Sequence, residues 1–188
     1  VCGTDENTGN VKQRVESEIE STGLSSGSFR FEICVEPEIN YKSFDQPLTD
    51  TQKVSLAGKL LDKYGDSFWW VHNYQLGKNP LFTSAMMHIS SNTEQKLLLH
   101  IHDFPECARF DNLEKLNKAG VITPYPAGNN TAYACINGRD TKLLKKAGLP
   151  ETRVFLMNNP VEDNFPGKII SFIQVHSTYE CFKGITFQ

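Results

Sequence analysis

Short apolar runs alternate with segments of helical periodicity along most of the chain. Between the apolar runs, hydrophobic residues recur at helical spacing, and Gly or Pro closes several of these segments. This alternation is typical of βαβ units and predicts an α/β fold, a Rossmann-like parallel sheet with helices on both faces. The five predicted strands are Phe29–Val35, Phe68–Val71, Lys96–Ile101, Thr131–Ile136 and Val154–Met157.

Capping residues mark the beginnings of three predicted helices. Thr49 stands three residues before Gln52, which is the spacing of a capping box. Asn79 precedes Pro80, which suits the first helical position because proline has no N–H to leave unpaired. Asn137 can cap a third helix. These helices follow the order expected of a doubly wound sheet.

The two ends of the chain depart from this pattern. Val1-Cys2-Gly3 reads as the end of a strand whose beginning is missing, and no Met stands at position 1. Residues 162–188 hold two β-like stretches but do not continue the alternation of strand and helix. We therefore expect a fragment with one domain over residues 1–161, followed by an atypical tail over residues 162–188.

Composition excludes several classes of protein. Of the 188 residues, 39% are hydrophobic, and 19 Lys and Arg stand against 22 Asp and Glu, a net charge of −3. Such a chain can build a core but has no large basic field, so nucleic acid is not an expected partner. No apolar run is long enough for a transmembrane segment. The five cysteines are scattered, odd in number and never spaced as C-x-x-C, which argues against both a disulfide framework and a zinc ribbon, and we expect a cytoplasmic protein.

Polar residues directly follow three of the predicted strands. In doubly wound sheets, ligands bind outside the carboxyl ends of the strands, so these residues are the candidates for chemistry. Each also has an ordinary explanation, because exposed loops are polar. The candidates are His72, Asn73 and Lys78 after one strand, His102, Asp103 and Arg109 after the next, and Asn137 and Arg139 after a third.

A metal site is an alternative use of the same residues. His100 and His102 are two apart on a predicted strand and so point to the same side. With Asp103, and with His72 if it lies near, they would suit a metal-dependent hydrolase. Because Asp103 is adjacent to His102, the H-x-H-x-D order is absent, and we assign no metal ligand. The chain also lacks the G-x-G-x-x-G and Walker sequences, so neither NAD nor ATP is an expected cofactor.

Several of these stretches resemble a known family. The segments His72–Pro80, Ile101–Glu106 and Asn137–Asp140, and the A-G-L-P turn and N-N-P-V sequence after them, look like the first domain of a bacterial glycosyltransferase of the GT-B fold, in the family-four retaining group. The likeness runs from about Phe29 to Val161. It implies one domain of a GT-B architecture, without its first strand, its Gly-rich loop and the donor domain.

The resemblance also implies an activity and roles for the candidates. A sugar would pass from a nucleotide-sugar donor to a glycan or lipid-linked acceptor, with no cofactor and with the donor held mainly by the missing domain, so the chain alone would be inactive. His102 would sit near the reacting sugar and Asp103 would orient it. The substrate-binding residues would be His72, Asn73, Lys78, Arg109, Asn137 and Arg139. A non-catalytic glycan-binding fragment is the remaining alternative, beside the hydrolase.

Overall fold

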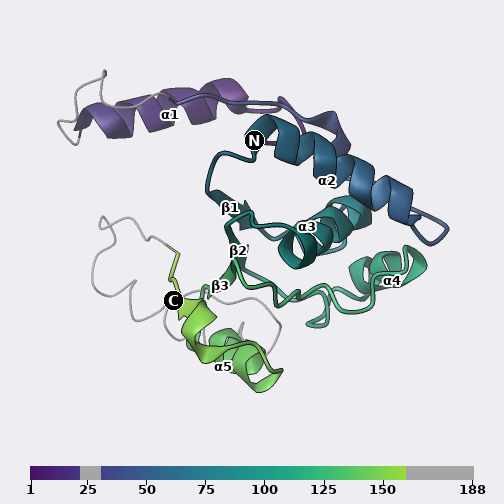
Figure 1. Ribbon diagram of the computed structural model, residues 1–188. Helices are drawn as coiled ribbons and strands as arrows, with labels where there is room; N and C mark the ends of the chain where they lie inside the picture. Colours follow the sequence, from purple (N-terminus) through teal and green to yellow (C-terminus); the bar gives the residue numbers. More distant parts are fainter. Residues whose placement is uncertain (22–30, 160–188) are drawn as a thin grey trace. The chain divides into compact units, whose positions relative to one another are not determined.

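A computed structural model describes residues 1–21 and 31–159 (Figure 1). The chain forms two compact units, Val1–Tyr41 and the part from Lys42 onward. The predicted tail at 162–188, the N-N-P-V sequence beyond Asn159 and the first two residues of the strand predicted at 29–35 lie outside the described residues.

The second unit is built on a four-stranded parallel sheet. The strands pair in chain order, β1 with β2, β2 with β3 and β3 with β4. The α/β Rossmann-like class is therefore confirmed, and four of the predicted strands are present. Their bounds are β1 Trp69–His72, β2 Leu97–Ile101, β3 Thr131–Cys135 and β4 Val154–Leu156.

The predicted capping residues begin the helices as expected. Thr49 and Gln52 form a capping box, Asn79 accepts hydrogen bonds from the backbone N–H groups at the start of α3, and Asn137 caps α5. The helices are α2 Asp50–Tyr64, α3 Pro80–Asn92, α4 Phe110–Lys118 and α5 Gly138–Lys146, with short 3-10 turns at η1 Pro37–Ile39 and η2 Glu151–Arg153.

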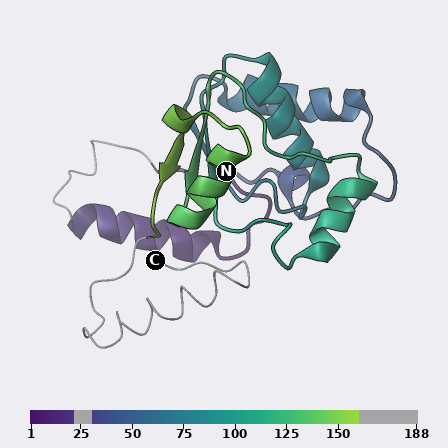
Figure 2. The same cartoon turned by 90° about the horizontal axis from the view of Figure 1, so that it is seen from below.

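One face of the sheet carries the core. Leu99 and Tyr133 are register neighbours on this face and are buried. The Ser90 hydroxyl of α3 lies 2.7 Å from that of Thr131 on the same face, and α5 lies against β3 and β4 (Figure 2). Because the strands follow one another in chain order, right-handed crossovers bring successive helices to the same side.

The opposite face of the sheet is more open and carries a different set of side chains. Trp70 on β1 is 53% exposed and Phe155 on β4 is 49% exposed. His72 and His100 are register neighbours on this face. The histidines therefore lie on the side of the sheet away from the core.

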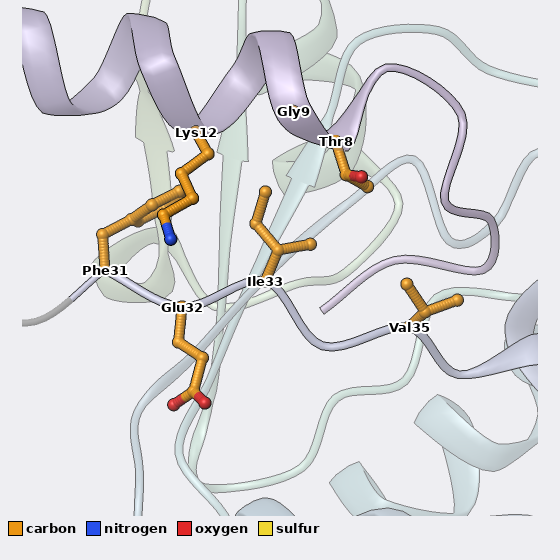
Figure 3. Close-up of a pocket in the computed structure, with 7 residues that line it drawn as sticks. All are labelled: Thr8, Gly9, Lys12, Phe31, Glu32, Ile33 and Val35. Atoms are coloured by element: carbon orange, nitrogen blue, oxygen red, sulfur yellow. The ribbon is translucent and has the colours of Figure 1, made fainter.

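The first unit contains α1, Thr8–Ser21, and one parallel bridge between Cys2 and Val35. The backbone N–H of Cys2 donates to Cys34 at 3.0 Å, and Glu36 donates back to Cys2 at 2.7 Å. The predicted strand at 29–35 is therefore wrong over residues 31–34, because within residues 1–21 and 31–159 only Cys2 pairs with this segment and a strand needs a partner along its length. An open pocket lies between α1 and this segment, with Lys12 reaching toward Phe31 and Glu32 (Figure 3).

Candidate functional site

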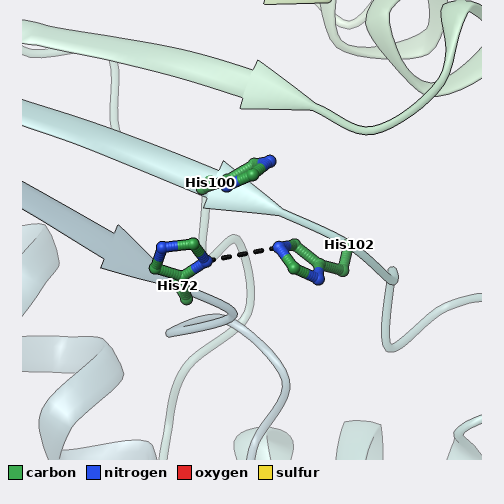
Figure 4. Close-up of side chains that lie close together, drawn as sticks. All are labelled: His72, His100 and His102. Atoms are coloured by element: carbon green, nitrogen blue, oxygen red, sulfur yellow. Dashed lines mark hydrogen bonds between the residues drawn. The ribbon is translucent and has the colours of Figure 1, made fainter. Parts of the chain in front are cut away.

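Three histidines meet at the carboxyl ends of β1 and β2 (Figure 4). His72 ends β1 and pairs in register with His100 on β2, and His102 follows two residues later. The ring centroids of His100 and His102 are 4.5 Å apart, which confirms that the two point to the same side. Nδ1 of His72 lies 3.3 Å from Nε2 of His102.

Asn73 holds the ends of the two strands together. Its φ of 49° lies in the left-handed region, which Asn tolerates better than most residues. Its backbone N–H donates to the carbonyl of His100 at 2.9 Å, and its side-chain oxygen accepts from the backbone N–H of His102 at 2.9 Å. Asn73, predicted to bind substrate, thus uses its side-chain oxygen to position His102.

Burial and mutual repulsion keep the three imidazoles neutral. Burial, followed by the charges that His102 and His72 would carry, lowers the pKa of His100 from 6.5 to about 4, with a small opposing effect of the Met157 backbone. Desolvation and the neighbouring His102 lower the pKa of His72. Desolvation also lowers the pKa of His102, against the opposing influence of the Asp103 carboxylate. At neutral pH the cluster therefore offers imidazole lone pairs and N–H donors rather than positive charge.

Trp70 covers one side of the cluster. Its ring stacks on that of His100 at a centroid distance of 5.7 Å and lies tilted against His72 at 4.9 Å. The indole restricts the positions that these two imidazoles can adopt.

Asp103 forms an ion pair with Arg109. Nη2 of Arg109 lies 2.6 Å from Oδ2 of Asp103, and the Asp103 side chain is only 16% exposed. The Asp103 carbonyl accepts from the buried Gln75 side chain at 2.5 Å. The structure therefore brings together two predicted site residues, Asp103 and Arg109, as an ion pair beside the cluster.

The remaining predicted residues lie at the starts of helices. The buried Asn137 side chain accepts from the Asp140 backbone N–H at 2.9 Å and donates to the Asp140 carboxylate at 2.7 Å, so it serves as the cap of α5. Arg139 is exposed, and its side chain makes a hydrogen bond with the Cys107 thiol. Lys78 is exposed just before α3, and its carbonyl accepts from Lys42 at 2.9 Å.

Sequence reasoning missed a tyrosine network near the same edge of the sheet. The hydroxyl of Tyr133 donates to the Pro126 carbonyl at 2.6 Å, Tyr74 donates to the Pro124 carbonyl, and Tyr125 donates to Glu106 at 2.7 Å. Burial raises the pKa of all three hydroxyls above the ordinary value of tyrosine. The Pro-Tyr-Pro sequence at 124–126 is the one available signal, because a loop with two prolines has few N–H donors for its carbonyls.

A mainly apolar cavity of about 400 Å³ lies beside this network. It runs along one side of α5, and both Glu106 and Cys107 reach its wall. Burial raises the pKa of the Cys107 thiol, with Arg139 opposing the change. The other residues that line the cavity are Phe104, Thr123, Tyr125, Leu143, Leu144, Ala147 and Leu149.

Comparison with known proteins finds a similar enzyme. The chain is 37% identical over 132 residues to mannosylglucosyl-3-phosphoglycerate synthase of Petrotoga mobilis, a match that covers 67% of this chain and 26% of that protein. The chain thus spans about a quarter of the length of this relative. No family model matches the chain, and no solved structure matches it significantly.

The similarity supports the interpretation of the sequence as related to a glycosyltransferase. None of the helices within residues 1–21 and 31–159 has the length and apolar character needed to cross a membrane.

Proposed function

We propose that this chain is the first domain of a retaining glycosyltransferase of the GT-B architecture, which transfers a sugar from a nucleotide-sugar donor to an acceptor. The observation that carries the proposal is the 37% identity over 132 residues to a synthase of a mannosylglucosyl compound. Polar side chains at the carboxyl ends of parallel strands support it, because substrates bind there in sheets of this kind. Since the match covers 26% of the relative, we expect the chain alone to bind acceptor without turnover.

His102 is the residue we place beside the reacting sugar. Retention at the anomeric carbon passes through an oxocarbenium-like transition state, which carries developing positive charge. A protonated imidazole would repel that charge, whereas burial lowers the pKa of His102 and keeps it neutral. A neutral ring can hydrogen-bond a sugar hydroxyl without this repulsion. Asn73 supports the role by holding the His102 backbone.

Asp103 acts on His102 at short range. Its carboxylate favours the protonated form of His102 electrostatically, while its ion pair with Arg109 opposes this effect. In the proposed function the Asp103–Arg109 ion pair limits the net charge beside the His102 imidazole. It also holds the loop after β2 in place. Arg109 is therefore a positioning residue first, with a phosphate contact as its second use.

The acceptor side carries exposed cations. Lys78 and Arg139 are exposed residues at the starts of α3 and α5. The name of the relative contains phosphoglycerate, an anionic group, and cations at the starts of helices suit an anion. We propose an acceptor of this anionic class, contacted by His72, Lys78 and Arg139.

The test is transfer by the complete gene product. The protein is incubated with glucosyl-3-phosphoglycerate and either GDP-mannose or UDP-glucose, and products are identified by mass spectrometry. His102→Ala is expected to lower kcat by about a hundredfold, because misplacing the reacting sugar by about 1 Å can cost this much. His88→Ala is the matched control, because His88 lies on α3 outside the cluster.

The outcomes separate the candidate functions. Transfer of either sugar that depends on His102 supports the proposal. Binding of the acceptor with no transfer from any nucleotide sugar supports a glycan-binding module. Full transfer by His102→Ala would refute the placement of that residue at the reacting sugar.

A further inference from the structure

We propose that His72, His100 and His102 form a binding site for a borderline transition-metal ion, of which Zn²⁺ is the prime example. Each residue offers one nitrogen, and the three nitrogens lie within 4.8 Å of one another (Figure 4). This site does not depend on the proposed sugar transfer. Of the residues that the sequence suggested as ligands, it contains His72, His100 and His102 but not Asp103.

The spacing of two nitrogens already matches a metal site. Zinc bound by imidazole at about 2.0–2.1 Å in a tetrahedron places neighbouring ligand nitrogens about 3.3 Å apart. Nδ1 of His72 and Nε2 of His102 are 3.3 Å apart. The largest separation among the three nitrogens is within 4.8 Å, which is longer than the distance between neighbouring ligand nitrogens in a tetrahedral site. The His100 imidazole must therefore turn toward the other two when a metal binds.

His100 supplies a second, independent observation. Its side chain is 4% exposed, and neither ring nitrogen makes a hydrogen bond of normal geometry within the described part of the chain. Leaving a buried polar group unpaired costs about 1–3 kcal/mol. A hydrogen bond between His72 and His102 accounts for the short distance between them. It does not explain why a third imidazole is buried beside them with no hydrogen bond of normal geometry. A shared metal ion would satisfy all three.

Rigid elements hold the backbone of each ligand. His72 and His100 are register neighbours on adjacent strands, and the backbone of His102 is bonded to Asn73. Metal sites built on strands need only side-chain rotation to close, because the ladder fixes the separation of the backbones. The inward turn that His100 requires is therefore a side-chain movement.

The kind of ligand selects the metal. Three imidazoles suit Zn²⁺, and also Ni²⁺ and Cu²⁺, whereas Mg²⁺ and Ca²⁺ prefer oxygen. Asp103 is engaged by Arg109 and is not part of the group. Three protein ligands leave a fourth position for water or another small molecule. In the complete enzyme the His102 imidazole would coordinate the bound ion, so metal and sugar would compete for this side chain.

The experiment uses the present chain, stripped of metal by chelator. Zn²⁺ is titrated in competition with a chromogenic chelator, and Co²⁺ replaces Zn²⁺ for absorption spectroscopy. We expect one ion per chain and a Co²⁺ spectrum of tetrahedral intensity without thiolate charge-transfer bands, because free cysteines are the competing ligands. Mg²⁺ at a large excess should not displace the ion.

Variants identify the ligands. Each of His72→Ala and His100→Gln should weaken the affinity for Zn²⁺ at least about tenfold, since even losses outside the ligand shell cost that much. His88→Ala, outside the cluster, should bind Zn²⁺ like the parent chain. Circular dichroism and the urea midpoint of each variant test whether the fold is retained. Gln is chosen at position 100 because it keeps a polar side chain at this buried position, where Ala would leave a cavity. The proposal is overturned by less than one ion per chain, by a Co²⁺ spectrum with thiolate bands, or by unchanged affinity in both cluster variants.

Discussion

Acidification should destabilise this protein through His100. The side chain is 4% exposed, and its ring centroid lies 4.5 Å from that of His102 and 4.8 Å from that of His72. Burial first, and then these two neighbours, lower its pKa from 6.5 to about 4. The unfolded chain restores the ordinary value, so between the two pKa values it binds more protons than the folded chain. The free energy of unfolding therefore rises with pH across this window and is at its full value above about pH 6.5.

The change in the pKa of His100 on folding sets the size of this loss of stability. One pKa unit corresponds to about 1.36 kcal/mol, so a fall from 6.5 to about 4 bounds the effect at about 3 kcal/mol. Outward rotation of the ring and entry of water reduce it, and we expect a loss of about 1–2 kcal/mol between about pH 7 and pH 4.5. The lowered pKa values of His72 and His102 act in the same direction.

Urea unfolding with a chelator present measures this effect. Midpoints are recorded at intervals from about pH 4.5 to pH 7.5 for the parent chain, for His100→Gln and for the control His88→Gln. His100→Gln removes the titrating ring but not the carboxylates that titrate in the same range, so the difference between the two curves isolates His100. We expect the parent and His88→Gln curves to be parallel and the His100→Gln curve to be flatter.

Two results would refute the reasoning. Equal slopes for the parent chain and His100→Gln between about pH 4.5 and pH 6.5 would mean that His100 titrates alike in the folded and unfolded chains. A steeper slope for His100→Gln would mean that the folded protein favours the charged imidazole, opposite to the effect of burial.

Three further substitutions test the surroundings of the site by urea or thermal unfolding. Asn79→Ala should cost about 1 kcal/mol, because the side-chain oxygen caps α3; Asn79→Asp, which keeps the oxygen, should cost less, and equal losses would contradict the cap. Gly77→Ala should cost more than about 1 kcal/mol, because φ is +69° and a Cβ would meet the Asn112 carbonyl; a neutral result would contradict this conformation. Tyr133→Phe should cost about 1–2 kcal/mol, because the hydroxyl donates to the buried Pro126 carbonyl at 2.6 Å; an unchanged melting temperature would show that the bond contributes nothing.

The prediction at 29–35 shows where pattern reading fails. The apolar alternation there is a sound strand signal, yet of the described residues 31–35 only Val35 makes a bridge, with Cys2. A strand forms only where an adjacent segment pairs with its backbone. The sequence of one segment does not reveal how many residues of the adjacent segment will pair with it. The four strands β1 to β4 formed as predicted because each pairs with a neighbouring strand along its length.

The candidate residues divide in a similar way. Asn73 and Asn137 follow strands, as binding residues do, but their side chains hold the His102 backbone and the start of α5. Asn is common both in ligand sites and at turns and caps, so position and residue type do not separate the two uses. Whether either also contacts substrate stays a prediction.

The sequence by itself determined the helices α2, α3 and α5, the four strands of the sheet and the placement of His72, His102 and Asp103 near strand ends. These features rest on local signals, because side-chain periodicity and capping act within a few residues. Only the tertiary structure decided that His72 meets both His100 and His102, while Asp103 turns to Arg109. Those contacts depend on the register of β1 against β2 and on the path of the loop after β2. Parallel strands are joined by long crossover connections, so their register and the loop path depend on packing between segments that lie far apart in the chain.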